Sequence, residues 1–333
     1  MYTDEDLYQA VKSGIFEESA VEEFRELISN QANTKSVDEE NFRLISGFND
    51  IFVSVSAFIL MISAGWISSQ ATPALGFFVV ALLSWVLSVF FVQKRRLALP
   101  AILLLISFVV SAVTCLTILF SALKFEKDMA VLVASGIGAL AAWVHWRKFH
   151  VPITVAAGIA SLIACLLALV SQVDSLMEII NLFICGSGFL TFALAMHWDS
   201  KDTLRKTRNS DVAFWLHLLS APLIVHPIFS SLGILKGESS LTGISVVIFM
   251  YVILAAISIA VDRRALMVSS LIYVLYAFRE LFNSYGMVSS SLAFSGVFIG
   301  SVLLLLSAFW HRSREILLKN IPGKYVKYVP PIN

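Results

Sequence analysis

Residues 99–121 of the chain read LPAILLLISFVVSAVTCLTILFS, a run of 23 residues without a charged side chain. A helix needs about 20 mostly apolar residues to cross the roughly 30 Å hydrocarbon layer of a bilayer. This run is therefore long enough to span a membrane. Its continuous apolar character argues against a membrane β-barrel, whose strands show alternating hydrophobicity over about 10 residues.

The same criterion predicts ten spans along the 333 residues of the chain. They cover residues 48–68, 73–92, 99–121, 129–146, 151–171, 175–197, 212–234, 241–261, 265–285 and 287–310. We therefore predict an all-α fold, a polytopic transmembrane helix bundle that occupies residues 47–310. Because the connections are short, we expect successive helices to be antiparallel neighbours.

The composition supports this class and excludes others. Apolar residues make up 58% of the chain and charged residues 14%, and the mean hydropathy is +0.83. Soluble domains have about 45–50% apolar and about 25% charged residues, so a soluble enzyme, a disordered chain and a nucleic-acid-binding domain are all excluded. Cys115, Cys165 and Cys185 lie inside apolar runs without metal-ligand spacing. With no catalytic motif in the sequence, we predict neither an enzyme nor a cofactor or metal site.

The basic residues give the bundle an orientation. With both termini in the cytoplasm, sixteen Lys and Arg residues lie in the inner loops and the C-terminal tail, against three outside. Loops rich in Lys and Arg stay on the cytoplasmic side. The sequence therefore predicts an N-in, C-in topology.

The basic loops also recur at similar intervals. Lys94 and Arg147 are 53 residues apart, Arg147 and Lys201 are 54 apart, and Arg263 and Arg312 are 49 apart. A tandem repeat of helical hairpins, as found in transporters, explains the interval. Any series of membrane hairpins with basic inner loops explains it as well, so both alternatives stay open.

The two ends of the chain differ from the middle. Residues 1–46 form an acidic cytosolic segment with helix-start signals at Thr3, Ser19 and Ser36 and a stop at Gly14. Residues 1–50 have a net charge of −8 and the remainder +9, so the acidic segment either docks on the basic loops or stays solvated as a helical hairpin. Residues 311–333 form a basic cytosolic tail, which we expect to contact anionic lipids of the inner leaflet.

Ionisable groups within spans are costly, and each one is a candidate functional residue. A group near the outer side of the spans forms a candidate polar pathway: Glu178, Asn181, His226, Arg279, Glu280 and Asn283. His226 is followed by Pro227, which removes a backbone hydrogen bond and frees a carbonyl that can line a polar cavity. Arg279 and Glu280 point about 100° apart on a helix, so we expect at least one to have a partner elsewhere. Snorkelling of Arg279, an interfacial Glu178 and a structural His226 are the alternatives.

A second group lies near the cytoplasmic surface among several tryptophans. It comprises His145, His197, Asp211, His217, Asp262 and His311. The tryptophans fit an aromatic belt at the inner interface, so anchoring is the main interpretation, and proton-responsive histidines are the alternative.

Small residues indicate where helices approach closely. Gly296 and Gly300 form a GxxxG pair, and Ala134, Gly138 and Ala142 form a similar strip. We expect such strips to hold the bundle together internally, with self-association through Gly296 and Gly300 as the alternative.

Two stretches carry a family resemblance. The chain resembles uncharacterised multi-pass inner-membrane proteins of proteobacteria in Asp211–His217 with Ala221–Pro227, and in Asp262–Leu266 leading to Tyr273–Ala277. The short acidic segment of residues 1–46, which we call the acidic head, resembles these proteins as well. The resemblance implies an inner-membrane location and transfers no catalytic residue.

Two functions follow as hypotheses. The first is a transporter of a small solute or ion, and the second is a membrane-embedded scaffold or sensor whose acidic head contacts a cytoplasmic partner.

Overall fold

The computed structural model describes residues 4–31, 47–203, 205, 207–232, 241–286, 290–319 and 329–330, and within these ranges the secondary structure is helical. The first five helices and a π-helical turn are α1 (Asp4–Lys12), α2 (Glu18–Gln31), α3 (Phe48–Ser69), α4 (Pro73–Ser88), η1 (Val89–Lys94) and α5 (Ala98–Ala122). The next five are α6 (Lys127–Phe149), α7 (Ile153–Val170), α8 (Asp174–Met177), α9 (Ile180–Ser200) and α10 (Arg208–Ser231). The last four are α11 (Leu241–Val261), α12 (Ala265–Ser284), α13 (Ser291–Ala308) and α14 (Trp310–Lys319).

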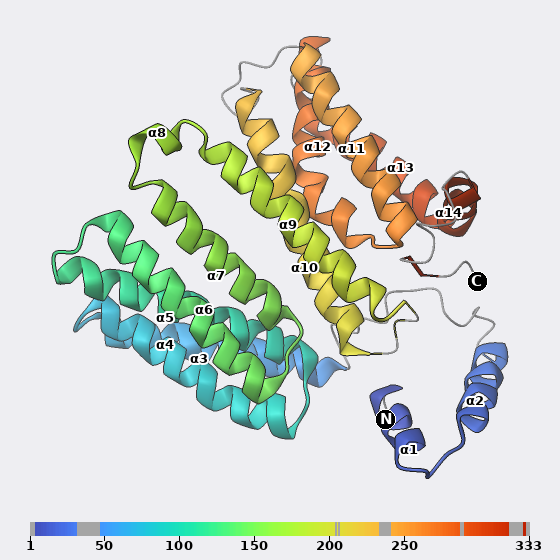
Figure 1. Ribbon diagram of the computed structural model, residues 1–333, viewed down its shortest axis with the longest axis horizontal. Coiled ribbons are helices and arrows are strands. Elements are labelled where there is room, and N and C mark those ends of the chain that lie inside the picture. The colour runs from blue at the N-terminus through green and yellow to red at the C-terminus, as the bar shows by residue number, and fades with distance from the viewer. Residues whose placement is uncertain are drawn as a thin grey trace.

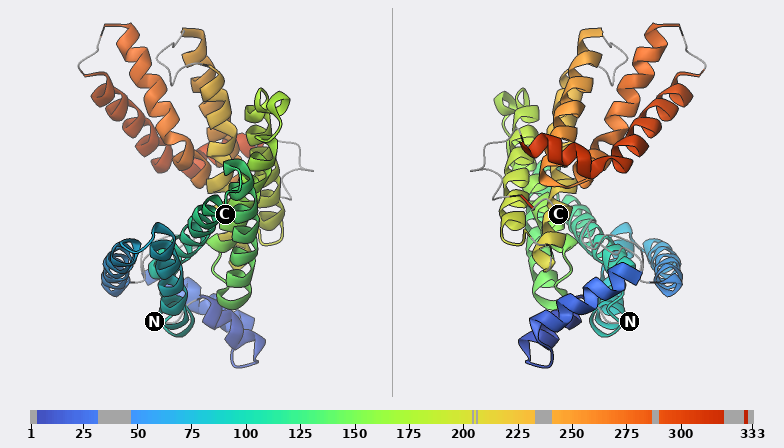
Figure 2. Two further views of the ribbon diagram at one scale, coloured as in Figure 1. Left: turned by 90° about the vertical axis from the view of Figure 1, so that its left-hand side faces the viewer. Right: turned by 90° about the vertical axis from the view of Figure 1, so that its right-hand side faces the viewer.

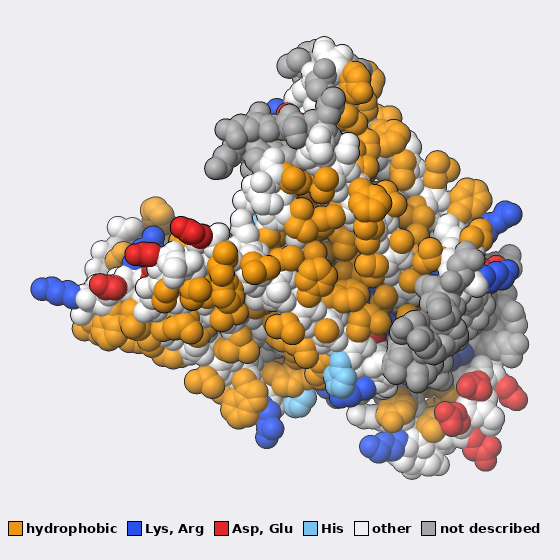
Figure 3. Space-filling view, turned by 45° about the horizontal axis from the view of Figure 1, so that its top comes forward, with side chains coloured by type: hydrophobic (Ala, Val, Ile, Leu, Met, Phe, Trp, Pro, Cys, Tyr) orange, Lys and Arg blue, Asp and Glu red, His pale blue; other side chains and the backbone are white. Residues whose placement is uncertain are grey.

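Ten of these helices are long and apolar enough to cross a membrane. They are α3, α4 with η1, α5, α6, α7, α9, α10, α11, α12 and α13, and they match the ten predicted spans one by one. Hydrophobic side chains cover most of the face in Figure 3, while charged side chains gather toward its ends. The protein is therefore a multi-pass membrane protein, as predicted.

The spans form two halves that meet at α10 (Figure 1). Helices α3 to α7 pack consecutively, and α9 to α13 make up the second half, with α7 contacting both α9 and α10. At the α8 end the two halves diverge (Figures 1 and 2). Helix α10 is the most buried span. Of its 18-residue apolar stretch 56% is buried, against 17–33% for the corresponding stretches of the other spans.

Successive helices differ in how extensively they pack. Helices pack most extensively in the pairs α9–α10, α6–α7 and α4–α5, each joined by a loop of the basic end. In contrast, α10 packs far more on α12 than on α11, although α11 follows it in the chain. Helices α10 and α11 are thus neighbours, as predicted, but their contact is small. Whether a hairpin repeat exists stays open.

The four loops at the basic end share one backbone feature. Each contains a non-glycine residue with positive φ: Arg96, His150, Arg205 and Asp262, with φ between 53° and 60°. At His150 and Asp262 this left-handed conformation directly follows the last residue of a helix, and at all four positions it has a steric cost of about 1–2 kcal/mol per residue. By the basic end we mean the end of the bundle where these four loops lie. Which end faces the cytoplasm stays a prediction.

Close helix contacts are found at one of the two predicted strips. Ala134 and Ala142 are buried, and a Cβ on Gly138 would clash with Val113 of α5 and lie 3.5 Å from Ser161 of α7. This strip therefore packs inside the bundle, as predicted. A Cβ on Gly296 or Gly300 meets no atom within 4 Å, so these glycines do not hold the described bundle together. Self-association through them stays a prediction.

The acidic head forms two of its three predicted helices. Helices α1 and α2 contact each other, and Gly14, with φ of 71°, follows the end of α1 as predicted. The helix predicted to begin near Ser36 lies outside the described residues. Docking of the head on the basic loops stays a prediction.

Candidate functional site

A buried charged network lies at the basic end, where α9, α10 and the α11–α12 turn meet. Asp199 is near the end of α9, His217 is on α10, and Arg263 is in the turn. Their side chains are at most 2% exposed, and Arg263 is the bulkiest fully buried side chain among the described residues. We call Asp199, Ser210, His217 and Arg263 the buried network.

Arg263 holds Asp199 with both arms of its guanidinium. Its Nε donates to Asp199 Oδ2 at 3.2 Å and its Nη2 to Oδ1 at 2.5 Å. Nη2 also donates to the Ser210 carbonyl at 3.1 Å and to Ser210 Oγ at 2.8 Å. This two-pronged geometry fixes distance and direction together, as in the strong class of charge-assisted hydrogen bonds. One arginine thereby ties the α11–α12 turn to both α9 and α10.

His217 completes the coordination of Asp199. Its Nε2 lies 2.9 Å from Asp199 Oδ2, and because an ionised carboxylate only accepts, Nε2 is assigned as the donor. The other ring nitrogen, Nδ1, is buried without a hydrogen-bond partner in the described part of the chain. With a neutral imidazole, the carboxylate and the guanidinium cancel, and the network has no net charge.

A second set of contacts surrounds the same turn nearer the surface. Arg205 Nη1 lies 3.0 Å from Asp262 Oδ2, and Arg205 Nη2 donates to the Asp262 carbonyl at 2.5 Å. Trp310 Nε1 donates to Asp262 Oδ1 at 2.6 Å, and Arg264 stacks over the Trp310 ring at 5.0 Å. We call Arg205, Asp262, Arg264 and Trp310 the loop network.

The three consecutive residues Asp262, Arg263 and Arg264 thus bind different elements. Asp262 holds the α9–α10 loop and α14, Arg263 holds α9 and α10, and Arg264 holds α14. The carbonyl of Arg263 also accepts from Ser258 Oγ of α11 at 2.5 Å. The turn therefore joins all the helices of the second half at this end except α13.

Replacing Trp310 with phenylalanine tests the link between the turn and α14. We expect the variant to lose about 1.5–3 kcal/mol of stability, because Phe keeps the ring but cannot donate to the Asp262 carboxylate. Hydrogen exchange should show faster exchange in α14 than in the wild type. Trp143→Phe is the control, since its exposed ring donates no hydrogen bond that the described residues show. Equal exchange in both variants would contradict the role of this bond.

The residues of the candidate polar pathway lie in separate pairs and single positions in the structure. His226 is exposed, and its Nδ1 lies 3.2 Å from the Tyr273 hydroxyl of α12. Arg279 and Glu280 approach each other at 4.0 Å, and Arg279 is 43% exposed. Among the described contacts, none joins Glu178 to His226 or Arg279. The remaining members lie apart from these pairs: Glu178 is exposed after α8, Asn181 is half-buried in α9 and Asn283 is half-buried in α12.

The second group of candidate residues, predicted to lie near the cytoplasmic surface, is divided between several environments. His217 is in the buried network and Asp262 in the loop network, while Asp211 lies in the first turn of α10. His145 is fully buried among Trp85, Phe108 and Phe149, and its Nδ1 lies 3.4 Å from Thr154 Oγ1. His197 and His311 are exposed.

Sequence reasoning missed Asp199, Ser210 and Arg263 as site residues. Asp199 and Arg263 stand beside predicted interfacial aromatics and basic loops, where charges are ordinary. Their pairing joins residues 64 positions apart, which no local pattern reveals.

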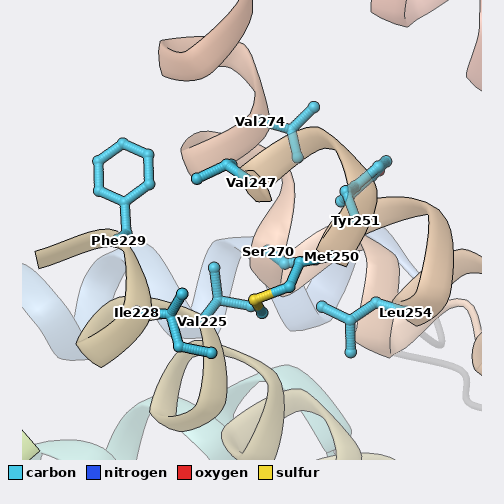
Figure 4. A pocket seen from close by; sticks show the side chains of 9 residues that line it. All are labelled: Val225, Ile228, Phe229, Val247, Met250, Tyr251, Leu254, Ser270 and Val274. Atoms are coloured by element: carbon cyan, nitrogen blue, oxygen red, sulfur yellow. The ribbon is translucent and has the colours of Figure 1, made fainter. Parts of the chain in front are cut away.

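The transmembrane interior has a small cavity between α10, α11 and α12 (Figure 4). Its volume is about 10 Å³, enough for about one water molecule. It is lined by Val225, Ile228, Phe229, Val247, Met250, Tyr251, Leu254, Ser270 and Val274. This cavity is thus mainly apolar. The polar cavity predicted near Pro227 stays a prediction.

Comparisons of the chain with protein-family models, curated proteins and solved structures find no match. The resemblance to uncharacterised inner-membrane proteins of proteobacteria therefore stays a prediction.

Proposed function

We propose that the protein is a membrane-embedded sensor whose buried network responds to protonation and changes the position of α14. The observation that supports this proposal is the buried Asp199, shared between Arg263 and His217 at a junction of five helices. A switch needs two discrete arrangements of an element and a local charge change that favours one of them. The Asp262–Arg263–Arg264 turn supplies the connection, because it binds both the titratable pair and α14.

The charges around His217 determine the direction of the response. Among the described residues, the charged groups in contact with this site or its turn are Asp199 of α9, Asp262 and Arg263 of the turn, and Arg205 of the α9–α10 loop, which pairs with Asp262. A proton added to His217 leaves the buried network with one uncompensated positive charge away from water, because Asp199 already balances Arg263. Burial of an unpaired charge is costly, so acid should loosen the network.

Distance measurements between spin labels test this response. In the 333-residue chain with Cys115, Cys165 and Cys185 replaced by serine, Lys201→Cys directly after α9 and Lys319→Cys at the end of α14 provide exposed label sites. We expect the label-to-label distance distribution to be unchanged near pH 8 and to broaden as the pH is lowered step by step to about 4, because protonation of a buried imidazole needs acid conditions. His217→Gln should remove this change, since the amide still donates to Asp199 but does not titrate.

His145→Gln is the matched control, because His145 is equally buried but lies in the other half. It should keep the wild-type response. A pH-dependent change that persists in His217→Gln, or its absence in the wild type, contradicts the proposal.

Transport is the second candidate function. Helix α10, the most buried span, is continuous but contains Pro222 and Pro227, each of which removes a backbone hydrogen bond, and helices with such weakened points occur at the binding sites of transporters. Proteoliposomes with an entrapped pH dye separate the two candidates. A sensor leaves proton permeability at the level of empty liposomes, while proton flux that His226→Ala abolishes supports transport.

A further inference from the structure

A group of cationic side chains at the basic end lies on neighbouring helices of the first half. Lys94 and Arg95 follow α4 at the end of η1, and Arg147 and Lys148 are in the last turn of α6. Helix α6 contacts η1, and Lys148 reaches from α6 over the Trp85 ring of α4 at 4.9 Å. We call Lys94, Arg95, Arg147 and Lys148 the cationic patch.

Each member of the cationic patch is stacked on an aromatic ring. Lys94 and Arg95 lie over the same ring, Phe90, at 6.0 Å and 5.7 Å. Arg147 lies over Trp143 at 5.6 Å. Phe90 and Trp143 are 45% and 57% exposed, so they belong to the outer surface of the bundle, where aromatic side chains mark the headgroup level of a membrane.

The π-helical turn explains why two cations share one ring. In η1 the Arg95 amide donates to the Phe90 carbonyl at 3.1 Å, a bond across five residues. A π-helix widens the turn in this way and is frequent at functional sites. As a result Arg95 lies above Phe90 together with Lys94.

The charges of the cationic patch are not neutralised within the described chain. All four side chains are exposed, and no carboxylate forms an ion pair with them among the described residues. Three acids at the basic end of the second half have other contacts: Asp199 binds Arg263, Asp262 binds Arg205, and Asp202 accepts from Thr207. The cationic patch therefore presents four fixed positive charges at headgroup level.

We infer that the cationic patch binds the phosphate of an anionic phospholipid headgroup. Cation–π stacking holds each charge on the outer surface of the bundle at its basic end. A basic site between transmembrane helices binds the phosphate of a lipid headgroup. The acyl chains then lie along the exposed apolar faces of α4 and α6. This inference is independent of the proposed sensor function.

Lipid binding to the full-length protein in detergent tests the inference, with native mass spectrometry measuring retained phosphatidylglycerol and phosphatidylcholine. We expect the wild type to retain phosphatidylglycerol in preference. Arg147→Gln with Lys148→Gln should weaken phosphatidylglycerol binding about 30-fold, because each lost basic side chain lowers the affinity by a factor of about 5.4. Phosphatidylcholine binding should be unchanged. The thermal unfolding temperature in phosphatidylcholine serves to confirm that the variant is folded.

The matched control is Lys124→Gln with Lys127→Gln, two exposed lysines at the opposite end of the bundle. It should bind both lipids like the wild type. Equal phosphatidylglycerol affinity in the two double variants overturns the inference. Carbodiimide cross-links from Lys94 or Lys148 to acids of residues 4–40, formed in phosphatidylglycerol nanodiscs, also overturn it, because the acidic head is then the occupant.

Discussion

Replacing Arg263 with methionine is expected to lower the free energy of unfolding by about 3–5 kcal/mol. The substitution keeps an unbranched side chain of similar length, but it removes both hydrogen bonds to the Asp199 carboxylate and the bonds to Ser210. Asp199 is 2% exposed, so its charge is then left without its cation and away from water. Reversible unfolding in bicelles gives the free energy.

Two further variants separate the loss of the pair from the loss of any arginine. Arg264→Met, in the next position, should cost only about 1 kcal/mol, because a cation–π contact with Trp310 is weaker than a buried ion pair. Asp199→Asn combined with Arg263→Met should be more stable than Arg263→Met alone, since no unpaired carboxylate stays buried. Similar losses for Arg263→Met and Arg264→Met would show that the buried network does not stabilise this end.

Replacing Gly188 with alanine is expected to destabilise the protein by about 1–3 kcal/mol. A Cβ at this position of α9 would lie 2.9 Å from the backbone nitrogen of Ile224 and 2.9 Å from the carbonyl carbon of Leu223. These are backbone atoms of α10, so relief requires the two helices to move apart. The measurement is again reversible unfolding, with the pH response of the spin labels as a second readout.

Gly186 provides the control two residues earlier on the same helix. A Cβ there meets nothing within 4 Å, so Gly186→Ala should stabilise α9 by about 0.5–1 kcal/mol through helix propensity. The two substitutions are chemically identical, and their opposite signs test the close α9–α10 contact. A stabilising Gly188→Ala would mean that these helices are further apart than the structure has them.

The ten spans were predictable because their signal is local. Each requires about 20 apolar residues in sequence, and runs such as residues 99–121 satisfy the bilayer by themselves. The exact ends of the helices next to charged loops were harder to predict, and several differ by a few residues from the predicted ends. Helix α10, for example, begins at Arg208 instead of residue 212, because Thr207 caps it by accepting from the Asn209 amide at 3.3 Å.

The candidate site was less predictable because it depends on which helices are neighbours. Hydropathy gives no reason for α10 to pack more on α12 than on α11, yet this packing places Tyr273 beside His226. His217 was recognised only as one of several histidines near the surface. Its function in the proposal depends on Asp199 and Arg263, whose charges resemble ordinary interfacial ones until the fold brings them together.

The burial of α10 also has a consequence for biosynthesis. Asp199 precedes Arg263 by 64 residues, so it enters the membrane region before its cation has been synthesised. Likewise α10 emerges before α12, on which it later packs. During translation Asp199 is therefore without Arg263, and α10 without α12, until the later residues are synthesised. In this interval α10 can pack only on α7 and α9. A ribosome that stalls after α11 therefore leaves an incomplete second half, and quality-control proteases should recognise such nascent chains more readily than chains interrupted after α7.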